Sequence, residues 1–221
     1  RKLQGVFVAA RDITEHKLTQ AQILNIALHD SLTKLPNRRL LYELLGQTIT
    51  ANQRSGRHAA LMFLDLDNFK SLNDTQGHHV GDLLLVEVSR RIVSCVRGVD
   101  VVARLGGDEF VVILRELNVD MKKSIAESST VAEKIRAALE KPYVLPFAEL
   151  GKEAATVEHR CTSSIGVVVF INHEQGQDGI LKCADAAMYD AKNAGRNMIM
   201  FYKPGMDVTA PEPPLSDIST S

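Results

Sequence analysis

Two adjacent carboxylates follow a pair of glycines between two apolar runs, and this stretch constrains the fold more than any other. Residues 101–103 and 110–114 have the length and composition of short buried strands. Gly106 and Gly107 tolerate the positive φ angles that a tight hairpin turn requires. The pattern predicts a β-hairpin that carries Asp108 and Glu109 at the rim of a sheet. Acidic residues are also common in solvated turns, so this stretch alone leaves a purely structural role open.

A second acidic site follows residues 59–64, whose side chains are apolar on both faces and indicate a central, covered strand. The run ends in Asp65 and Asp67, which the period of a strand would place on one face. Unpaired buried charge is costly, so packing explains this ending poorly, although a solvated strand end remains an alternative. Together with the hairpin, the strand would gather hard oxygen ligands of the kind that suits Mg²⁺ in phosphoryl transfer.

Composition narrows the class of protein. The 221 residues are enough for one full domain with attachments, and a net charge of -1 provides no basic field for nucleic acid. The three cysteines, Cys95, Cys161 and Cys183, are widely spaced in apolar contexts and indicate a reduced, cytoplasmic protein. No apolar run predicts a membrane contact within the chain, and no signal peptide is evident. We expect a piece of a longer protein whose upstream part could carry a membrane anchor.

The remaining sequence predicts an alternation of helices and strands. Amphipathic helices are expected over residues 15–29, 38–55, 80–96, 131–139 and 180–193, with Asp82 opening the third and Gly195 capping the last. Residues 118–126 are expected to form a polar loop with a variable helix start, 146–157 a hairpin or insertion, and 160–169 a buried strand. The Pro-, Ser- and Thr-rich sequence after residue 203 predicts disorder.

Several motifs, taken together, resemble the GGDEF family of diguanylate cyclases. They are the Gly-Gly-Asp-Glu-Phe run at 106–110, the Phe-Leu-Asp-Leu-Asp-Asn-Phe-Lys run at 63–70, and the Asn-Asp-Thr-Gln-Gly-His-His-Val-Gly-Asp run at 73–82. Residues 30–39 and 189–197 match the opening and closing motifs. The motifs occur in family order over residues 28–202. Residues 1–13 resemble the end of a PAS sensor domain that leads into a helical signalling linker at 14–29, so the cyclase domain is expected at 30–203 and a tail at 204–221.

The resemblance implies an α/β fold of the palm-like nucleotidyl cyclase type, with a central, mostly antiparallel sheet flanked by helices. It implies an enzyme that condenses two GTP molecules into cyclic di-GMP and releases two pyrophosphates. Each subunit of a homodimer would bind one GTP, and each 3′-hydroxyl would attack the α-phosphate of the other. The implied cofactor is Mg²⁺, with Mn²⁺ as an alternative.

Family positions also imply roles for individual residues. Asp65, the backbone carbonyl of Leu66 and Asp108 would hold the metal. Asp108 would also accept the 3′-hydroxyl proton or stabilise the alkoxide, and Glu109 would contact metal or substrate. The substrate-binding residues implied are Asn73 and Asp82 on the guanine edge, His78 on the substrate loop, and Lys70, Lys192 and Arg196 at the triphosphate. Because a carboxylate can accept two hydrogen bonds from the guanine edge, Asp82 predicts guanine selectivity.

Each of these residues also has a plain structural interpretation. Asp82 would favour a helix dipole at the helix start, and Lys192 and Arg196 would favour it at a helix end. Asn73 and Asp74 are ordinary turn residues, and His78 suits any surface. Their occurrence together at family spacing favours the functional interpretation.

Arg97 and Asp100 form an Arg-x-x-Asp motif upstream of the glycine pair, and in the family such a motif is the inhibitory site for cyclic di-GMP. Arginine can donate a bidentate pair of hydrogen bonds to guanine or phosphate, and aspartate can accept guanine N–H groups. A surface ion pair is the alternative. Lys134 and Arg136 are candidates for a second contribution from the next helix.

Three functions therefore compete. The first is a product-inhibited diguanylate cyclase. The second is a catalytically silent domain that serves as a receptor for GTP or cyclic di-GMP, which the intact metal and signature residues disfavour. The third is another palm-type cyclase or polymerase, which Asp82 and the near-neutral charge disfavour.

Overall fold

The computed structural model describes residues 27–147, 155–171 and 176–203. Its centre is a five-stranded sheet with the order β2-β3-β1-β6-β7. The strands are β1 (Ala59–Leu66), β2 (Val101–Gly106), β3 (Glu109–Leu114), β6 (Ser163–Phe170) and β7 (Ile199–Phe201). All neighbouring strands are antiparallel except β6 and β7, which are parallel. The expected palm-like α/β fold with a mostly antiparallel sheet is thus confirmed.

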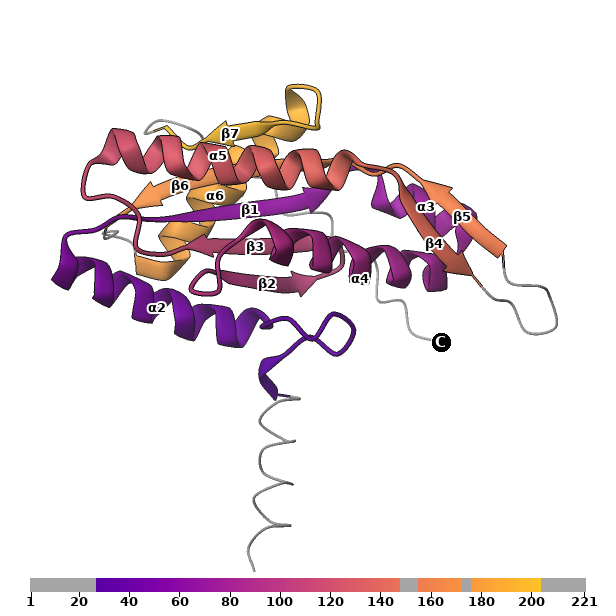
Figure 1. The fold of residues 1–221 in the computed structure, drawn as a ribbon, viewed down its shortest axis with the longest axis horizontal. Coiled ribbons are helices and arrows are strands. Elements are labelled where there is room, and N and C mark those ends of the chain that lie inside the picture. The colour runs from indigo at the N-terminus through magenta and orange to yellow at the C-terminus, as the bar shows by residue number, and fades with distance from the viewer. Residues whose placement is uncertain (1–26, 148–154, 172–175, 204–221) are drawn as a thin grey trace, which may run out of the picture.

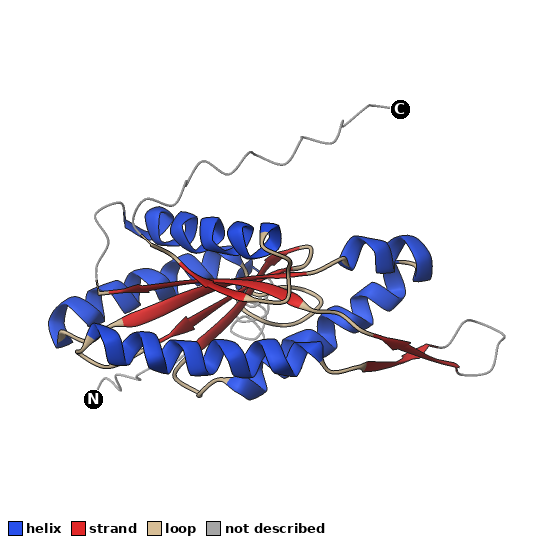
Figure 2. Ribbon diagram, turned by 90° about the horizontal axis from the view of Figure 1, so that it is seen from above, coloured by secondary structure: helices blue, strands red, loops and turns tan. Residues whose placement is uncertain are grey.

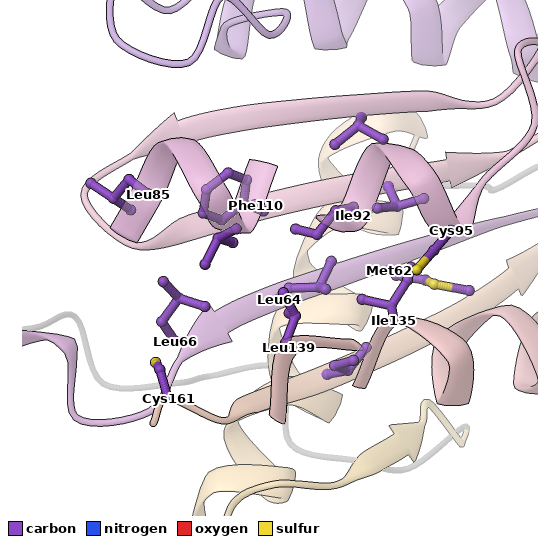
Figure 3. Close-up of a cluster of buried hydrophobic side chains, with 14 of the residues drawn as sticks. Met62, Leu64, Leu66, Leu85, Ile92, Cys95, Phe110, Ile135, Leu139 and Cys161 are labelled. Carbon is purple, nitrogen blue, oxygen red and sulfur yellow. The ribbon is translucent and has the colours of Figure 1, made fainter. Parts of the chain in front are cut away.

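Helices cover both faces of this sheet (Figures 1 and 2). One face packs against α4 (His78–Cys95) and α5 (Met121–Glu140), and the other against α2 (Arg38–Ser55) and α6 (Gly176–Asn193). Even-numbered β1 residues such as Met62 and Leu64 enter the first core, whereas Leu61 and Phe63 enter the second. Figure 3 shows the first core, where Met62, Leu64 and Leu66 meet side chains of α4 and α5. The strand is buried along its whole length, as a central strand with two apolar faces should be.

Two outer elements complete the described chain. The short helix α3 (Phe69–Gln76) links β1 to α4, and strands β4 (Tyr143–Phe147) and β5 (Ala155–His159) form a separate antiparallel pair. This pair extends away from the main sheet in both ribbon views (Figures 1 and 2). The antiparallel pairing agrees with the hairpin alternative for residues 146–157, although the two strands reach from Tyr143 to His159.

Several boundaries differ from those that the sequence predicts. Helix α5 begins at Met121, so part of the loop expected at 118–126 is helical. Asp120 caps this helix by accepting a hydrogen bond from the Lys123 N–H at 2.9 Å, and the polar composition reflects an exposed face. Helix α4 begins at His78, so Asp82 lies inside the helix instead of opening it. No membrane-crossing helix is found among the described residues. The predicted PAS remnant, most of the linker and the tail lie outside the described ranges.

Close packing of α6 on the sheet requires one particular glycine. A Cβ at Gly166 of β6 would collide with the backbone of α6 at Ala184 and Met188. Helix α6 therefore rests directly on β6. This contact fixes the position of α6 relative to the sheet, and the last turn of α6 carries Lys192.

Candidate active site

Three carboxylates and one lysine meet where β1 ends and the β2–β3 hairpin turns. Asp65 and Glu109 are directly paired across β1 and β3, so their side chains share one face of the sheet. Asp108 lies in the turn immediately before β3. From the last turn of α6, Lys192 Nζ donates to Asp65 Oδ1 at 2.8 Å. The hairpin and the strand ending therefore gather the acidic residues that the sequence singled out.

These carboxylates are held in a costly environment. Burial, together with the charges of Asp108 and Glu109, raises the pKa of Asp65 to about 6 despite the hydrogen bond from Lys192. Burial also raises the pKa of Asp108 and that of Glu109, and Asp185 on α6 repels the Glu109 charge. Keeping all three carboxylates ionised is unfavourable here, even with the ammonium group of Lys192 beside them. Such clustering of perturbed carboxyl groups in one place is typical of functional sites.

The oxygen donors at this site fit a hard divalent cation whose coordination shell would be completed by the substrate. Its protein oxygens would come from the carboxylates of Asp65 and Asp108 and from the carbonyl of Leu66, the last residue of β1. No three His, Cys, Asp or Glu side chains gather into a self-sufficient metal site within the described ranges. Mg²⁺ normally uses one or two carboxylates and fills its shell with water and phosphate oxygens. The residues present therefore suit Mg²⁺ better than a metal that needs an all-protein cage.

An arginine that the sequence reasoning did not assign anchors the acidic hairpin. Arg104 donates through Nε and Nη2 to the Gly107 carbonyl at 3.0 and 2.8 Å, and through Nη1 to Asp30 Oδ1 at 2.9 Å. Asp30 in turn accepts hydrogen bonds from the N–H and the hydroxyl of Thr33. Gly107 has a φ of 51°, which only glycine adopts readily. The opening motif at 30–39 thus braces the turn that presents Asp108.

The guanine-edge candidates lie where α3 and α4 pack together. Asn73 is on α3, so its interpretation as a turn residue is wrong, and its Oδ1 is buried without a hydrogen-bond partner. This oxygen faces Gly81 of α4, where an added Cβ would collide with it. Asp82, the next residue, is exposed. Because Asp82 is a full turn inside α4, the helix-dipole explanation for it is weakened.

The remaining substrate candidates lie on separate elements. Lys70 in the first turn of α3 and His78 at the start of α4 are both exposed. Arg196 is exposed in the loop after α6, where its φ is 64°. A left-handed arginine is uncommon, so the interpretation of Arg196 as a simple helix-end cation does not explain its backbone.

Asp67 has a structural role that the sequence did not reveal. It is 5% exposed, and its carboxylate accepts hydrogen bonds from the Thr162 and Ser164 hydroxyls at 2.6 and 2.8 Å and from the Asn197 N–H at 3.1 Å. Because strand β1 ends at Leu66, Asp67 does not continue the face of Asp65. These hydrogen bonds to the Asp67 carboxylate join the end of β1 to β6 and to the loop after α6.

A cavity of about 270 Å³ opens beside Glu109, between α2 and α6. Arg38 and Tyr42 of α2 and Asp185 of α6 are among the residues that line it. Asp185 was not predicted from the sequence, where its helical spacing alone gives no functional signal. Glu109 therefore borders an open cavity on the α6 side of the sheet.

The Arg-x-x-Asp motif lies at the other end of β2 from the acidic hairpin. At about 3.3 Å per residue, β2 separates the two by roughly 20 Å. Asp100 accepts hydrogen bonds from the backbone N–H groups of Arg97 and Arg115 at 2.9 and 3.0 Å, so it shapes the loop. A cavity of about 450 Å³ is lined by Arg97, Gly98 and Asp100 with apolar neighbours.

The two candidate second contributors differ in position. Lys134 Nζ donates to the carbonyls of Ser94 and Cys95 at 3.4 and 3.1 Å, next to the motif. Arg136 instead donates to Asn197 Oδ1 at 2.7 Å, so it serves the loop after α6 and not the Arg-x-x-Asp motif.

Comparison with known proteins agrees with this geometry. The family model described as "Diguanylate cyclase, GGDEF domain" matches residues 27–198. The chain is 41% identical over 191 residues to the bifunctional diguanylate cyclase/cyclic di-GMP phosphodiesterase MucR of Pseudomonas aeruginosa, covering 86% of this chain and 26% of that protein. The chain thus spans about a quarter of that relative's length.

Solved structures show the same fold. The GGDEF domain of YfiN (TpbB) from Pseudomonas aeruginosa superposes with a TM-score of 0.69 and 35% identity, covering 79% of this chain and 94% of that one. The coiled coil and GGDEF domain of DgcB from Caulobacter crescentus, in complex with c-di-GMP, gives a TM-score of 0.73 at 26% identity, covering 86% and 93%. The chain described here belongs to the GGDEF family of diguanylate cyclase domains.

Proposed function

We propose that residues 30–203 form a catalytic domain that condenses two GTP into cyclic di-GMP and two pyrophosphates. The observation that carries the proposal is the gathering of Asp65, Asp108 and Glu109 at one sheet edge, beside Lys192. The kinship with named diguanylate cyclases supports it. The substrates are cytoplasmic nucleotides, so the reaction is proposed to take place in the cytoplasm.

Asp65, Asp108 and the Leu66 carbonyl would hold Mg²⁺, or Mn²⁺ as the alternative. A bound divalent cation supplies charge neutralisation for the phosphates and favours the ionised form of an attacking hydroxyl. Lys192 now pairs with Asp65 at 2.8 Å, and in the loaded site it would turn to a phosphate oxygen. Lys70 and Arg196 would bind the same triphosphate.

Asp108 is proposed to accept the proton of the attacking 3′-hydroxyl, because burial raises its pKa toward the range in which a carboxylate takes up protons well. Glu109 shares the face of Asp65 and would orient metal or substrate. Asn73 and Asp82 would hydrogen-bond the guanine edge, and His78 would border the pocket. The unpaired Oδ1 of Asn73 is consistent with a position completed by a ligand.

The active form is proposed to be a homodimer, because one site holds one GTP and the product joins two. Product inhibition is proposed at Arg97 and Asp100, with Lys134 as the second contributor because it lies beside their loop. Binding at this end of β2 would act on a hairpin whose other end carries Asp108.

The test is chromatography of nucleotides after incubation of the chain with GTP and Mg²⁺. We expect cyclic di-GMP and pyrophosphate from the wild type and from the control Asp74→Asn, which changes an exposed acid on α3. Asp108→Asn should give neither product. Tight binding of GTP or cyclic di-GMP without turnover, at protein concentrations that allow dimers, would instead support the silent-receptor alternative.

A further inference from the structure

The loop that carries Arg196 has an unusual backbone. Gly195, Arg196 and Asn197 follow α6 in succession with φ angles of 129°, 64° and 47°. Glycine accepts such angles readily and asparagine tolerates them better than most residues, whereas arginine adopts them rarely. A sparsely populated conformation persists only where surrounding contacts determine it. The contacts that hold this loop therefore decide where the Arg196 side chain begins.

Asn197 is held from three directions. Its backbone N–H donates to Asp67 Oδ2 at 3.1 Å, its side-chain oxygen accepts from Arg136 Nη1 at 2.7 Å, and its side-chain amide donates to Glu140 Oε1 at 3.0 Å. The first contact ties the loop to the end of β1. The other two tie it to α5, which packs against the opposite face of the sheet from α6.

Arg136 is itself oriented by two acids of its own helix. Its guanidinium donates to Glu133 at 2.8 and 2.9 Å and to Glu140 at 3.1 Å. The Arg136 side chain is 19% exposed, whereas those of Glu133 and Glu140 are 55% and 48% exposed. Exposed pairs of this kind add little to stability, but together they fix a planar donor group toward one acceptor. These pairs are therefore better suited to orienting the Arg136 guanidinium than to stabilising the fold.

We propose that Arg136 is a positioning residue for the triphosphate: through Asn197 it holds the left-handed loop that aims Arg196 at the phosphates. The inference rests on the proposed function, which assigns Arg196 to the triphosphate. The guanine-edge residues Asn73 and Asp82 are on α3 and α4, and none of the contacts of Arg136 and Asn197 described above involves those helices. Loss of Arg136 should therefore weaken binding of the phosphate chain and leave guanine binding unchanged.

The test compares two ligands by calorimetry in the presence of Mg²⁺. One is the α,β-methylene analogue of GTP, which cannot release pyrophosphate because a P–C bond replaces the P–O bond that breaks in condensation, and the other is GMP. Arg136→Ala and Asn197→Ala should each lose about tenfold in affinity for the analogue, the scale of one charge-assisted hydrogen bond, with GMP affinity unchanged. Arg136→Lys keeps the charge without the planar fork and should fall between Arg136→Ala and the wild type. Arg90→Ala is the matched control, because Arg90 is an exposed arginine paired with Glu87 on α4.

Three results would overturn the inference. Wild-type affinity for the analogue in Arg136→Ala and Asn197→Ala, with a clear loss in Arg196→Gln, would leave Arg196 in its role and remove Arg136 from it. An equal loss for the analogue and GMP would show a general structural effect. Unchanged affinity in Arg196→Gln would refute the assignment of Arg196 on which the inference rests, whereas product formation by the wild type tests the proposed activity separately.

Discussion

Replacing Asp65 by asparagine should stabilise the metal-free protein while it abolishes activity. In the folded protein the pKa of Asp65 is about 6, against an ordinary value of 3.8, because burial and the neighbouring carboxylates disfavour its charge. Keeping it ionised above pH 7 therefore costs roughly 3 kcal/mol. Asparagine has a similar shape, carries no charge and still offers Lys192 an acceptor. We expect a gain approaching this figure, about 2 kcal/mol, in the free energy of unfolding at pH 8.

The sign of the pH dependence follows from the raised pKa. Between pH 3.8 and about 6 the folded wild type holds a proton that the unfolded chain has released, so wild-type stability falls as the pH rises through this window and stays lower above it. The Asp65→Asn variant has no carboxyl group at this position, so its stability does not fall for this reason as the pH rises. The difference between Asp65→Asn and wild type should consequently be small near pH 4 and largest at pH 8.

Urea unfolding in the presence of a chelator, at pH 4, 6 and 8, measures this difference. Asp74→Asn is the control and should change the free energy of unfolding by no more than about 0.5 kcal/mol. Added Mg²⁺ should stabilise the wild type and stabilise Asp65→Asn much less, because the variant keeps only Asp108 of the two proposed carboxylate ligands. Equal stability of variant and wild type at pH 8, or a destabilised variant, would refute the account of a strained carboxylate cluster.

Three further substitutions test other parts of the site. Asp30→Asn removes the charged partner of Arg104 in a pair whose side chains are only 19% and 10% exposed, and should cost about 2 kcal/mol in urea unfolding near neutral pH. Burial alone would raise the pKa of Asp30, but hydrogen bonds from Thr33 and Arg104 lower it, so this contribution should disappear as the pH falls below 3.8 toward the folded pKa. An unchanged urea midpoint near neutral pH would contradict the bracing role of Asp30. Gly81→Ala places a Cβ against Asn73 Oδ1 and should raise the KM for GTP several-fold with a smaller change in kcat, whereas an unaltered KM would remove Asn73 from guanine binding. Arg97→Ala should raise the concentration of cyclic di-GMP needed for half inhibition by about tenfold or more, and an unshifted inhibition curve would exclude the Arg-x-x-Asp site.

Local sequence signals sufficed for the sheet and its acidic edge. Apolar runs with two covered faces predicted β1 and the β2–β3 hairpin, and paired glycines placed Asp108 in the turn. A helix start was expected within residues 118–126, but its position at Met121 could not be predicted because serine and lysine on an exposed face resemble a loop. Helix α3 escaped because its eight residues are too few to show a clear period.

Contacts between distant segments could not be predicted from one sequence. Arg104 and Asp30 are 74 positions apart, and only the fold brings them within 2.9 Å. Asp67 has the same residue type as Asp65 and follows it by two positions, yet the end of β1 turns it toward Thr162 and Ser164. The left-handed backbone at Arg196 has no local signal beyond the flanking Gly195 and Asn197. Residue type and spacing suggested chemistry, whereas tertiary packing decided which carboxylates remain available for it.

The most direct test of the proposed activity uses 3′-deoxy-GTP, which lacks the attacking hydroxyl. Incubated alone with the protein and Mg²⁺, it should release no pyrophosphate. Mixed with an equal amount of GTP, it should give a linear dinucleotide, made when a GTP hydroxyl attacks the analogue, in addition to cyclic di-GMP. Steady pyrophosphate release from 3′-deoxy-GTP alone would show hydrolysis instead of condensation and would contradict the assignment of this site as a diguanylate cyclase.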